Sequence, residues 1–110
     1  MKAIINNYKI WINEVEPGIL VPKIEEILNK SNYSILNFIE HKFEPYGYTC
    51  MWLLAESHLA IHTFPEEGSS YVELSSCNEI MNNSFIKELN IWLAEASIKS
   101  SSEDKLTTKP

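Results

Sequence analysis

The sequence predicts one α+β domain, a two-layer sandwich in which an antiparallel sheet carries two helices on one face. Two patterns predict this class: several short segments are rich in β-branched and aromatic residues, and two longer segments have apolar residues at helical spacing. The connections between successive strands are too short for the crossovers that parallel strands need. With 110 residues, of which 45% are hydrophobic, the chain can bury one modest core.

Five strands are expected, at residues 8–13, 34–43, 49–55, 59–64 and 69–77. The first strand alternates, with Tyr8, Ile10 and Ile12 on one face. The third is continuously apolar, which is typical of a strand covered on both faces. Pro65 ends the fourth strand. The stretch 44–47, Glu-Pro-Tyr-Gly, is a hairpin-type loop between the second and third strands.

Two helices are expected, one between the first two strands and one after the last. The apolar face of the first helix consists of Leu20, Ile24, Ile27 and Leu28, and that of the second of Phe85, Ile86, Leu89, Trp92, Leu93 and Ala96. Pro22 suits the first turn of the first helix, and Asn83 or Ser84 is the predicted N-cap of the second. Residues 99–110 are polar and predicted to be a disordered tail, so the domain comprises residues 1–98.

Composition argues against several classes of protein. The net charge of −6, without a basic cluster, argues against a nucleic-acid partner. No segment approaches the ~20 continuous apolar residues of a membrane span, and the N-terminus does not resemble a signal peptide. The two cysteines, Cys50 and Cys77, come without any other mark of secretion. We therefore expect a cytoplasmic protein with reduced thiols.

The stretch 53–68, LLAESHLAIHTFPEEG, places polar residues inside an apolar, β-prone run. His58, His62 and Glu66 have the spacing of metal ligands on a helix, but on a strand residues four apart are ~13 Å from each other, so we expect no metal site. A serine hydrolase is also disfavoured. The G-x-S-x-G turn is missing around Ser57, and the only aspartate is Asp104 in the predicted tail.

Together these residues resemble one family. The run 55–66, AESHLAIHTFPE, followed by Gly68 and Cys77, is similar to the small bacterial and archaeal S-adenosylmethionine decarboxylases. Those pyruvoyl enzymes have an E-S-H-x-x-I-H-T-[WF]-P-E core and a cysteine twenty residues after the serine. The stretch 41–47, HKFEPYG, resembles the H-x-F-x-P-Y-G segment of that family. The resemblance covers residues 38–77.

The resemblance implies that the chain cuts itself between Glu56 and Ser57. Ser57 then becomes the pyruvoyl group, which is the cofactor and binds the substrate amine as a Schiff base. His62 matches the base of this self-processing, and Thr49 stands where the family usually has a serine that assists it.

The same resemblance implies the residues of the turnover site. Cys77 matches the acid that returns a proton to the substrate. Phe43 and Phe64 match residues that stack on the adenine, and Glu66 is a candidate substrate contact. The small-molecule substrate would be S-adenosylmethionine, decarboxylated for spermidine and other polyamines. The sheet face left open by the helices would meet a second copy in a homodimer, with residues of both subunits at each site.

Departures from the family pattern keep other interpretations open. Residues 6–9, Asn-Asn-Tyr-Lys, stand where the family usually has a Gly-Arg-His-like segment, and Asn78 follows Cys77 where glycine is common. Many family members also add a strand after the second helix, whereas none is expected here. Arginine or ornithine are therefore alternative substrates for the same chemistry. A non-catalytic binding or regulatory subunit is a further alternative. Ser57 and His62 also have opposite strand parity, so the scheme needs Ser57 to lie in a turn or beside a bulge.

Overall fold

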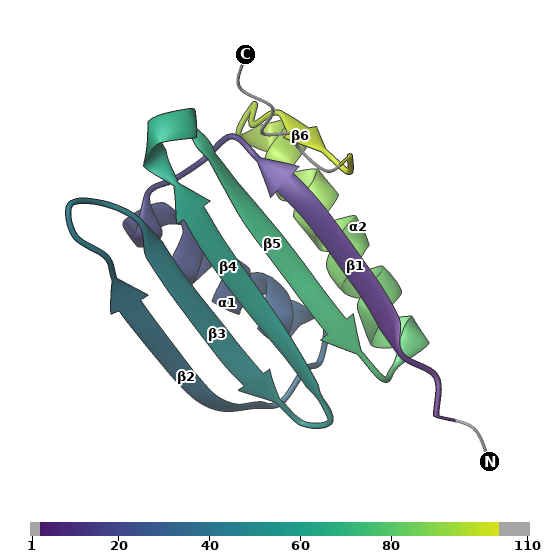
Figure 1. Ribbon diagram of the computed structural model, residues 1–110. Coiled ribbons are helices and arrows are strands. Elements are labelled where there is room, and N and C mark those ends of the chain that lie inside the picture. The colour runs from purple at the N-terminus through teal and green to yellow at the C-terminus, as the bar shows by residue number, and fades with distance from the viewer. Residues whose placement is uncertain (1–2, 104–110) are drawn as a thin grey trace.

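The computed structural model describes residues 3–103, and these form an antiparallel sheet with two helices packed on one face (Figure 1). The strands are β1 (Asn6–Ile12), β2 (Ile35–Lys42), β3 (Tyr48–Leu54), β4 (Ser57–Phe64), β5 (Ser69–Ser76) and β6 (Ser100–Ser101). The helices are α1 (Pro17–Lys30) and α2 (Glu79–Glu95), and a 3-10 turn, η1 (Pro65–Glu67), links β4 to β5. The predicted α+β sandwich with both helices on one face is confirmed.

The sheet order is β2-β3-β4-β5-β1-β6, with antiparallel pairing between all neighbours. Strands β2 to β5 follow one another as hairpins, and β1 pairs with β5. The strand β4 is therefore central, with β3 on one side and β5 on the other. In Figure 1 the sheet lies in front and both helices lie behind it, so the viewer faces the uncovered side, which we call the open face.

The core lies between the sheet and the helices. Alternate residues of the strands face the helices and are buried, among them Ile12, Trp52, Leu59, Ile61, Val72 and Leu74. They meet the apolar faces of the helices, among them Leu20, Ile24, Phe85 and Leu89. The Trp52 Nε1–H donates to Glu25 Oε1 at 3.0 Å and ties β3 to α1. Each such aliphatic or aromatic side chain contributes about 1.5–3 kcal/mol through burial.

Strand β3 is covered on its helix face alone. Cys50, Trp52 and Leu54 are buried there, whereas Leu53 on the open face is 49% exposed. The expectation of a strand covered on both faces is therefore not met within one chain. Burial raises the pKa of the Cys50 thiol to about 12, so this cysteine is an inert core residue.

A β-bulge interrupts β2 beside Leu36, where the pairing with β3 shifts between Ile35 and Asn37. The extra residue resets the alternation, so Phe38 faces the core and contacts Trp52 with ring centroids 4.8 Å apart. Simple alternation from the sequence placed Ile35 and Phe38 on opposite faces, and the bulge brings both to the face of the core.

Both helices begin earlier than the apolar pattern indicates. The helix α1 begins at Pro17, which places Pro22 in its second turn. The helix α2 begins at Glu79, and its N-cap is Asn78, whose side chain accepts from the Met81 N–H at 2.9 Å. The prediction of Asn83 or Ser84 as the cap is wrong. In the first turn of α2 the apolar Ile80 is 82% exposed and the polar Asn82 is buried, so apolar periodicity does not detect it.

The chain forms a further strand after α2. Ser100 and Ser101 pair with Ile12 and Trp11 as β6, and the Asn13 N–H donates to the Lys99 carbonyl at 2.9 Å. The predicted disordered tail is therefore wrong at these residues, because edge pairing uses backbone groups and needs no apolar side chain. The rest of that prediction, residues 104–110, lies outside the described residues. No helix within residues 3–103 has the length and apolar character needed to cross a membrane.

The observed cap leads to a stability prediction. Asn78→Ala should lower the free energy of unfolding by about 1 kcal/mol, because an amide N–H of the first turn loses its acceptor. Asn83→Ala is the matched control, since Asn83 is exposed and lies within the helix. Urea unfolding of the two variants measures both effects. A larger loss for Asn83→Ala than for Asn78→Ala would contradict the observed helix start.

Candidate active site

The β3–β4 hairpin closes through a two-residue turn, Ala55–Glu56, between the paired residues Leu54 and Ser57. Glu56 has φ 60°, a left-handed conformation that costs a residue with a Cβ about 1–2 kcal/mol. Among the described residues two other non-glycine residues share this feature, Asn32 and Ser97, and each follows the end of a helix, where left-handed residues are usual. Glu56 is therefore the strained residue of a hairpin turn, directly before Ser57.

Ser57 and Cys77 lie together at this end of the sheet. Because β4 and β5 pair with His58 opposite Ser75, the start of β4 lies beside the end of β5. The Ser57 Oγ accepts a hydrogen bond from the Cys77 backbone N–H at 3.2 Å. The Cys77 side chain is exposed, and Ser57 is half-buried. The hydroxyl of Ser57 is thus held in place, with its own proton free for donation to another group.

His62 and Thr49 form a second cluster, farther along β4 and on the open face. The two residues are directly opposite each other in the β3–β4 ladder. Thr49 Oγ1 lies 3.0 Å from His62 Nδ1, within hydrogen-bond distance. This bond occupies one ring nitrogen and leaves Nε2 as the nitrogen available for proton transfer.

Five of the predicted site residues line one cavity of about 300 Å³. They are Phe43, Thr49, His62, Phe64 and Glu66, and the remaining lining consists of Tyr46, Gly47, Tyr48 and Thr63. The cavity therefore combines aromatic rings, an imidazole and a carboxylate. Tyr46 and Tyr48 were not singled out from the sequence, although Tyr46 belongs to the Glu-Pro-Tyr-Gly loop that was.

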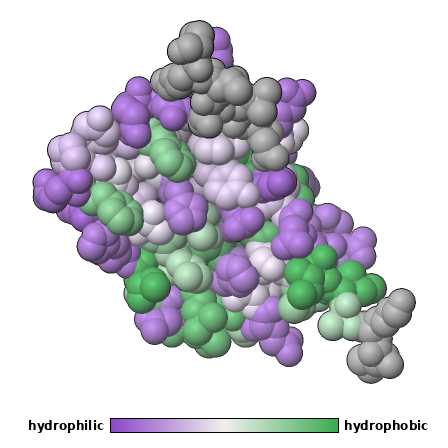
Figure 2. Space-filling model, in the orientation of Figure 1, coloured by the Kyte–Doolittle hydropathy of each residue, from purple (hydrophilic) through white to green (hydrophobic). Residues whose placement is uncertain are grey.

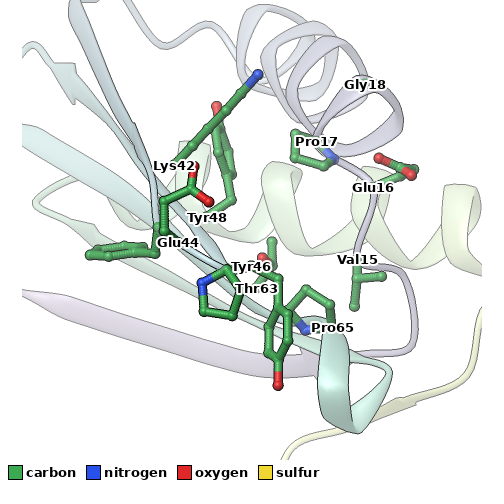
Figure 3. A pocket seen from close by; sticks show the side chains of 13 residues that line it. Val15, Glu16, Pro17, Gly18, Lys42, Glu44, Tyr46, Tyr48, Thr63 and Pro65 are labelled. Atoms are coloured by element: carbon green, nitrogen blue, oxygen red, sulfur yellow. The ribbon is translucent and has the colours of Figure 1, made fainter.

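A wider hollow of about 470 Å³ lies on the other side of this loop, toward the start of α1 (Figure 3). Tyr46 lies beside Pro65 in that view, with Glu16, Pro17 and Gly18 across the hollow. Glu40 accepts from the Tyr48 hydroxyl at 2.5 Å, and burial, together with this carboxylate, raises the pKa of Tyr48. Tyr48 is therefore a neutral hydrogen-bond donor that supports the wall between the two hollows.

The structure does not bring Ser57 and His62 together within one chain. They are five residues apart on one regular strand, which separates them by about 16 Å. Leu59, Ile61 and Thr63 are buried toward the helices, whereas His62 belongs to the alternate set on the open face. The turn before Ser57 changes its surroundings, but no bulge re-aims it toward His62. The predicted residues thus form two separate half-sites.

The first half-site comprises Glu56, Ser57 and Cys77, and the second comprises Phe43, Thr49, His62, Phe64 and Glu66. His58 is exposed and belongs to neither. Among residues 3–103 no three His, Cys, Asp or Glu side chains gather in a set that could hold a metal ion.

The open face carries an apolar patch over β2 and β3, visible in green in Figure 2. Ile39 is 59% exposed and Leu53 is 49% exposed, with the half-buried Met51 between them. The three side chains line a shallow hollow of about 220 Å³. An exposed patch of large apolar residues on a sheet is typical of an interaction surface.

Comparisons with known proteins agree with the resemblance. The family model described as S-adenosylmethionine decarboxylase matches residues 16–104. The "S-adenosylmethionine decarboxylase proenzyme" of Prochlorococcus marinus (strain MIT 9313) is 48% identical over 50 residues, which are 46% of this chain and 40% of that protein. The protein of the same name from Pseudomonas aeruginosa (strain LESB58) is 39% identical over 57 residues, 52% of this chain and 36% of that protein. The matched stretch thus spans well under half of these relatives.

A solved structure shares the whole fold. The crystal structure of the adenosylmethionine decarboxylase from Aquifex aeolicus VF5 superposes with a TM-score of 0.67 and covers 100% of this chain and 98% of that chain. Its sequence identity is 16%, so this likeness concerns the fold. The family model, by contrast, matches most of the sequence, including the Glu56–Ser57 turn, His62 and Cys77. This chain belongs to the S-adenosylmethionine decarboxylase family.

Proposed function

We propose that this chain is a self-processing, pyruvoyl-dependent decarboxylase that converts S-adenosylmethionine to its decarboxylated form for polyamine synthesis. The observation that carries the proposal is the Glu56–Ser57 bond itself. It joins a left-handed residue in a tight turn to a serine whose Oγ is held by the Cys77 N–H. The relatives are named as proenzymes, which agrees with a chain that matures by cleavage.

Self-processing begins with attack of Ser57 Oγ on the Glu56 carbonyl carbon. The C–N bond breaks, the Ser57 nitrogen takes the proton, and the amide becomes an ester. A base then removes the Ser57 α-proton, its electron pair forms the Cα=Cβ bond, and the Cβ–Oγ bond breaks to release the Glu56 carboxylate. Water replaces ammonia at the resulting terminal residue, which becomes the pyruvoyl group. Opening the turn frees Glu56 from its left-handed conformation, which favours cleavage.

The residues around Ser57 suit a pyruvoyl group at this position. The group supplies the electron sink that decarboxylation of an amino acid requires and that no side chain offers. Cys77 follows β5 beside it, with an exposed side chain and a backbone N–H that reaches Ser57. Its thiol is the proposed acid that returns a proton to the substrate carbon after loss of CO2.

The base in this scheme is His62 of a second copy. A catalytic base must come within about 3 Å of the proton it removes, and about 16 Å of strand separate His62 from Ser57 in one chain. We propose a homodimer that stacks its open faces, so that the Thr49–His62 pair of one copy meets Ser57 and Cys77 of the other. The exposed apolar patch around Ile39 and Leu53 is the surface that such stacking would cover.

The cavity beside His62 would then hold the nucleoside part of the substrate. Its volume of about 300 Å³ lies at the lower end of the range for small-molecule sites. Phe43 and Phe64 offer flat rings for an adenine, and Glu66 offers a carboxylate. A cavity lined with aromatic rings favours a flat ring system over the flexible aliphatic chains of ornithine and arginine.

The proposal predicts two fragments on a denaturing gel. The purified protein should separate into 1–56 and a pyruvoyl-blocked 57–110, and Ser57→Ala should abolish cleavage because the nucleophile is gone. Ser75→Ala is the control, since Ser75 is a half-buried serine near the same end of the sheet and should leave cleavage unchanged. Mass spectrometry identifies the new terminus. A single intact chain with an unmodified serine would exclude the pyruvoyl mechanism.

The two-subunit site predicts complementation between inactive variants. Ser57→Ala and His62→Ala should each fail to mature alone, whereas co-expression should restore cleavage of the His62→Ala chain and of that chain alone. In a mixed dimer, Ser57 of the His62→Ala chain meets His62 of the Ser57→Ala chain. Two affinity tags distinguish the chains on a gel. If neither chain is cleaved in a purified mixed dimer, His62 does not act across the interface.

The identity of the substrate is measured by release of CO2 from S-adenosylmethionine, ornithine and arginine in parallel. We expect turnover of S-adenosylmethionine, with a KM raised roughly tenfold in Phe43→Ala because a stacking surface is lost. Faster turnover of ornithine or arginine would contradict the assignment of substrate. A cleaved protein that releases CO2 from none of the three would instead support a binding or regulatory role.

A further inference from the structure

His62 lies in a continuous row of side chains that crosses the open face. Strand register places Thr49 opposite His62, His62 opposite Tyr71, and Tyr71 opposite Trp11. We call Trp11, Tyr71, His62 and Thr49 the His62 row. Thr49 lies on one side of the imidazole, and Tyr71 lies on the other. Nothing in the cleavage motif points to Tyr71, which follows η1 on β5.

The Tyr71 ring lies nearly parallel to the His62 imidazole, with an interplanar angle of 24° and ring centroids 6.3 Å apart. Thr49 contacts a single ring atom, Nδ1. One hydrogen bond still allows the imidazole plane to rotate about that contact. A flat neighbour on the opposite side restricts that plane. The two contacts together therefore orient the ring, which neither does alone.

Tyr71 is itself held from two directions. Its hydroxyl donates to Glu73 Oε1 at 3.1 Å. Its ring packs on Trp11 with centroids 5.1 Å apart and an angle of 52°. The hydrogen bond to Glu73 and the packing against Trp11 restrict the motion of the Tyr71 ring, which lies beside His62. Tyr71 is not among the residues that line the cavity beside His62.

We propose that Tyr71 is a positioning residue for His62 in self-processing, a role that rests on the proposed function. When Nε2 of His62 takes the Ser57 α-proton, the Nδ1–H must donate to Thr49 Oγ1, since Nε2 must be unprotonated beforehand. The imidazole then becomes a cation. The nearly parallel Tyr71 ring restricts the orientation of the imidazole during this transfer, at a centroid distance within the range of aromatic pairs.

The test compares Tyr71→Leu and Tyr71→Phe, with Phe38→Leu as the matched control. Phe38 is a half-buried aromatic residue that packs on Trp52 on the helix face, so its replacement removes a ring without touching His62. Cleavage of freshly refolded chains is followed on gels, and hydroxylamine measures the ester that awaits elimination. We expect Tyr71→Leu to slow cleavage about tenfold and to accumulate ester, and Tyr71→Phe to stay near the wild-type rate.

A merely structural role for Tyr71 gives a different pattern. It would lower the melting temperature and the total yield of Tyr71→Leu without accumulation of ester, as expected for Phe38→Leu. That result, or a wild-type rate in Tyr71→Leu, overturns the proposal. An uncleaved wild-type chain would instead refute the pyruvoyl function on which the proposal rests, so the two failures are distinguishable.

A second measurement does not depend on cleavage. In the Ser57→Ala chain, the nitrogen shifts of the three histidines report which ring nitrogen carries the proton. We expect one dominant Nδ1–H form for His62, and averaged shifts once Tyr71→Leu is added, with His41 and His58 unchanged. Identical His62 shifts in both chains would contradict an orienting role for Tyr71.

Discussion

The double pairing of β4 is the constraint on which the rest of the structure depends. This strand is bonded to β3 on one side and to β5 on the other, in a register without interruption. Because side chains alternate and each residue advances the strand by about 3.3 Å, the pairing determines where every polar residue of the motif lies. A one-residue slip would bury His62 and expose Ile61. Burial of Leu59 and Ile61 on β4 therefore fixes the strand register on which the proposed chemistry depends.

In the proposed mechanism, the separation of Ser57 from His62 along one strand also gives the open face a role. The proposed chemistry needs a second molecule, because the two half-sites lie about 16 Å apart along one strand. The exposed side chains of Ile39 and Leu53 agree with this requirement, since a sheet face that stays in water is ordinarily polar. The catalytic proposal and the surface thus favour the same stacking.

Sequence patterns were most informative where burial repeats with a regular period. The alternating strands and the helix faces could be read from apolar positions, whereas features made by backbone or polar contacts could not. The cap at Asn78 precedes a turn in which the apolar Ile80 is exposed and the polar Asn82 is buried. The bulge at Leu36 shifts the alternation without a glycine to mark it. The contact of Ser57 Oγ with the Cys77 N–H depends on the register between two strands. Tyr71 was missed for the same reason, because its role depends on the residue opposite it.

The position of the proposed break also fits the stability of the fold. The Ala55–Glu56 turn joins two strands that are each held from their other side, β3 by β2 and β4 by β5. Trp52 further ties β3 to α1 through Glu25. Cutting between Glu56 and Ser57 affects only the terminal ladder pair of the hairpin, Leu54 with Ser57, and no pair in the interior of the sheet. The free energy lost is therefore mainly the entropy of keeping two chains together. The strain at Glu56 is relieved in the same step. The turn between the interior strands β3 and β4 can therefore be cleaved while the hydrophobic core that holds both fragments together stays intact.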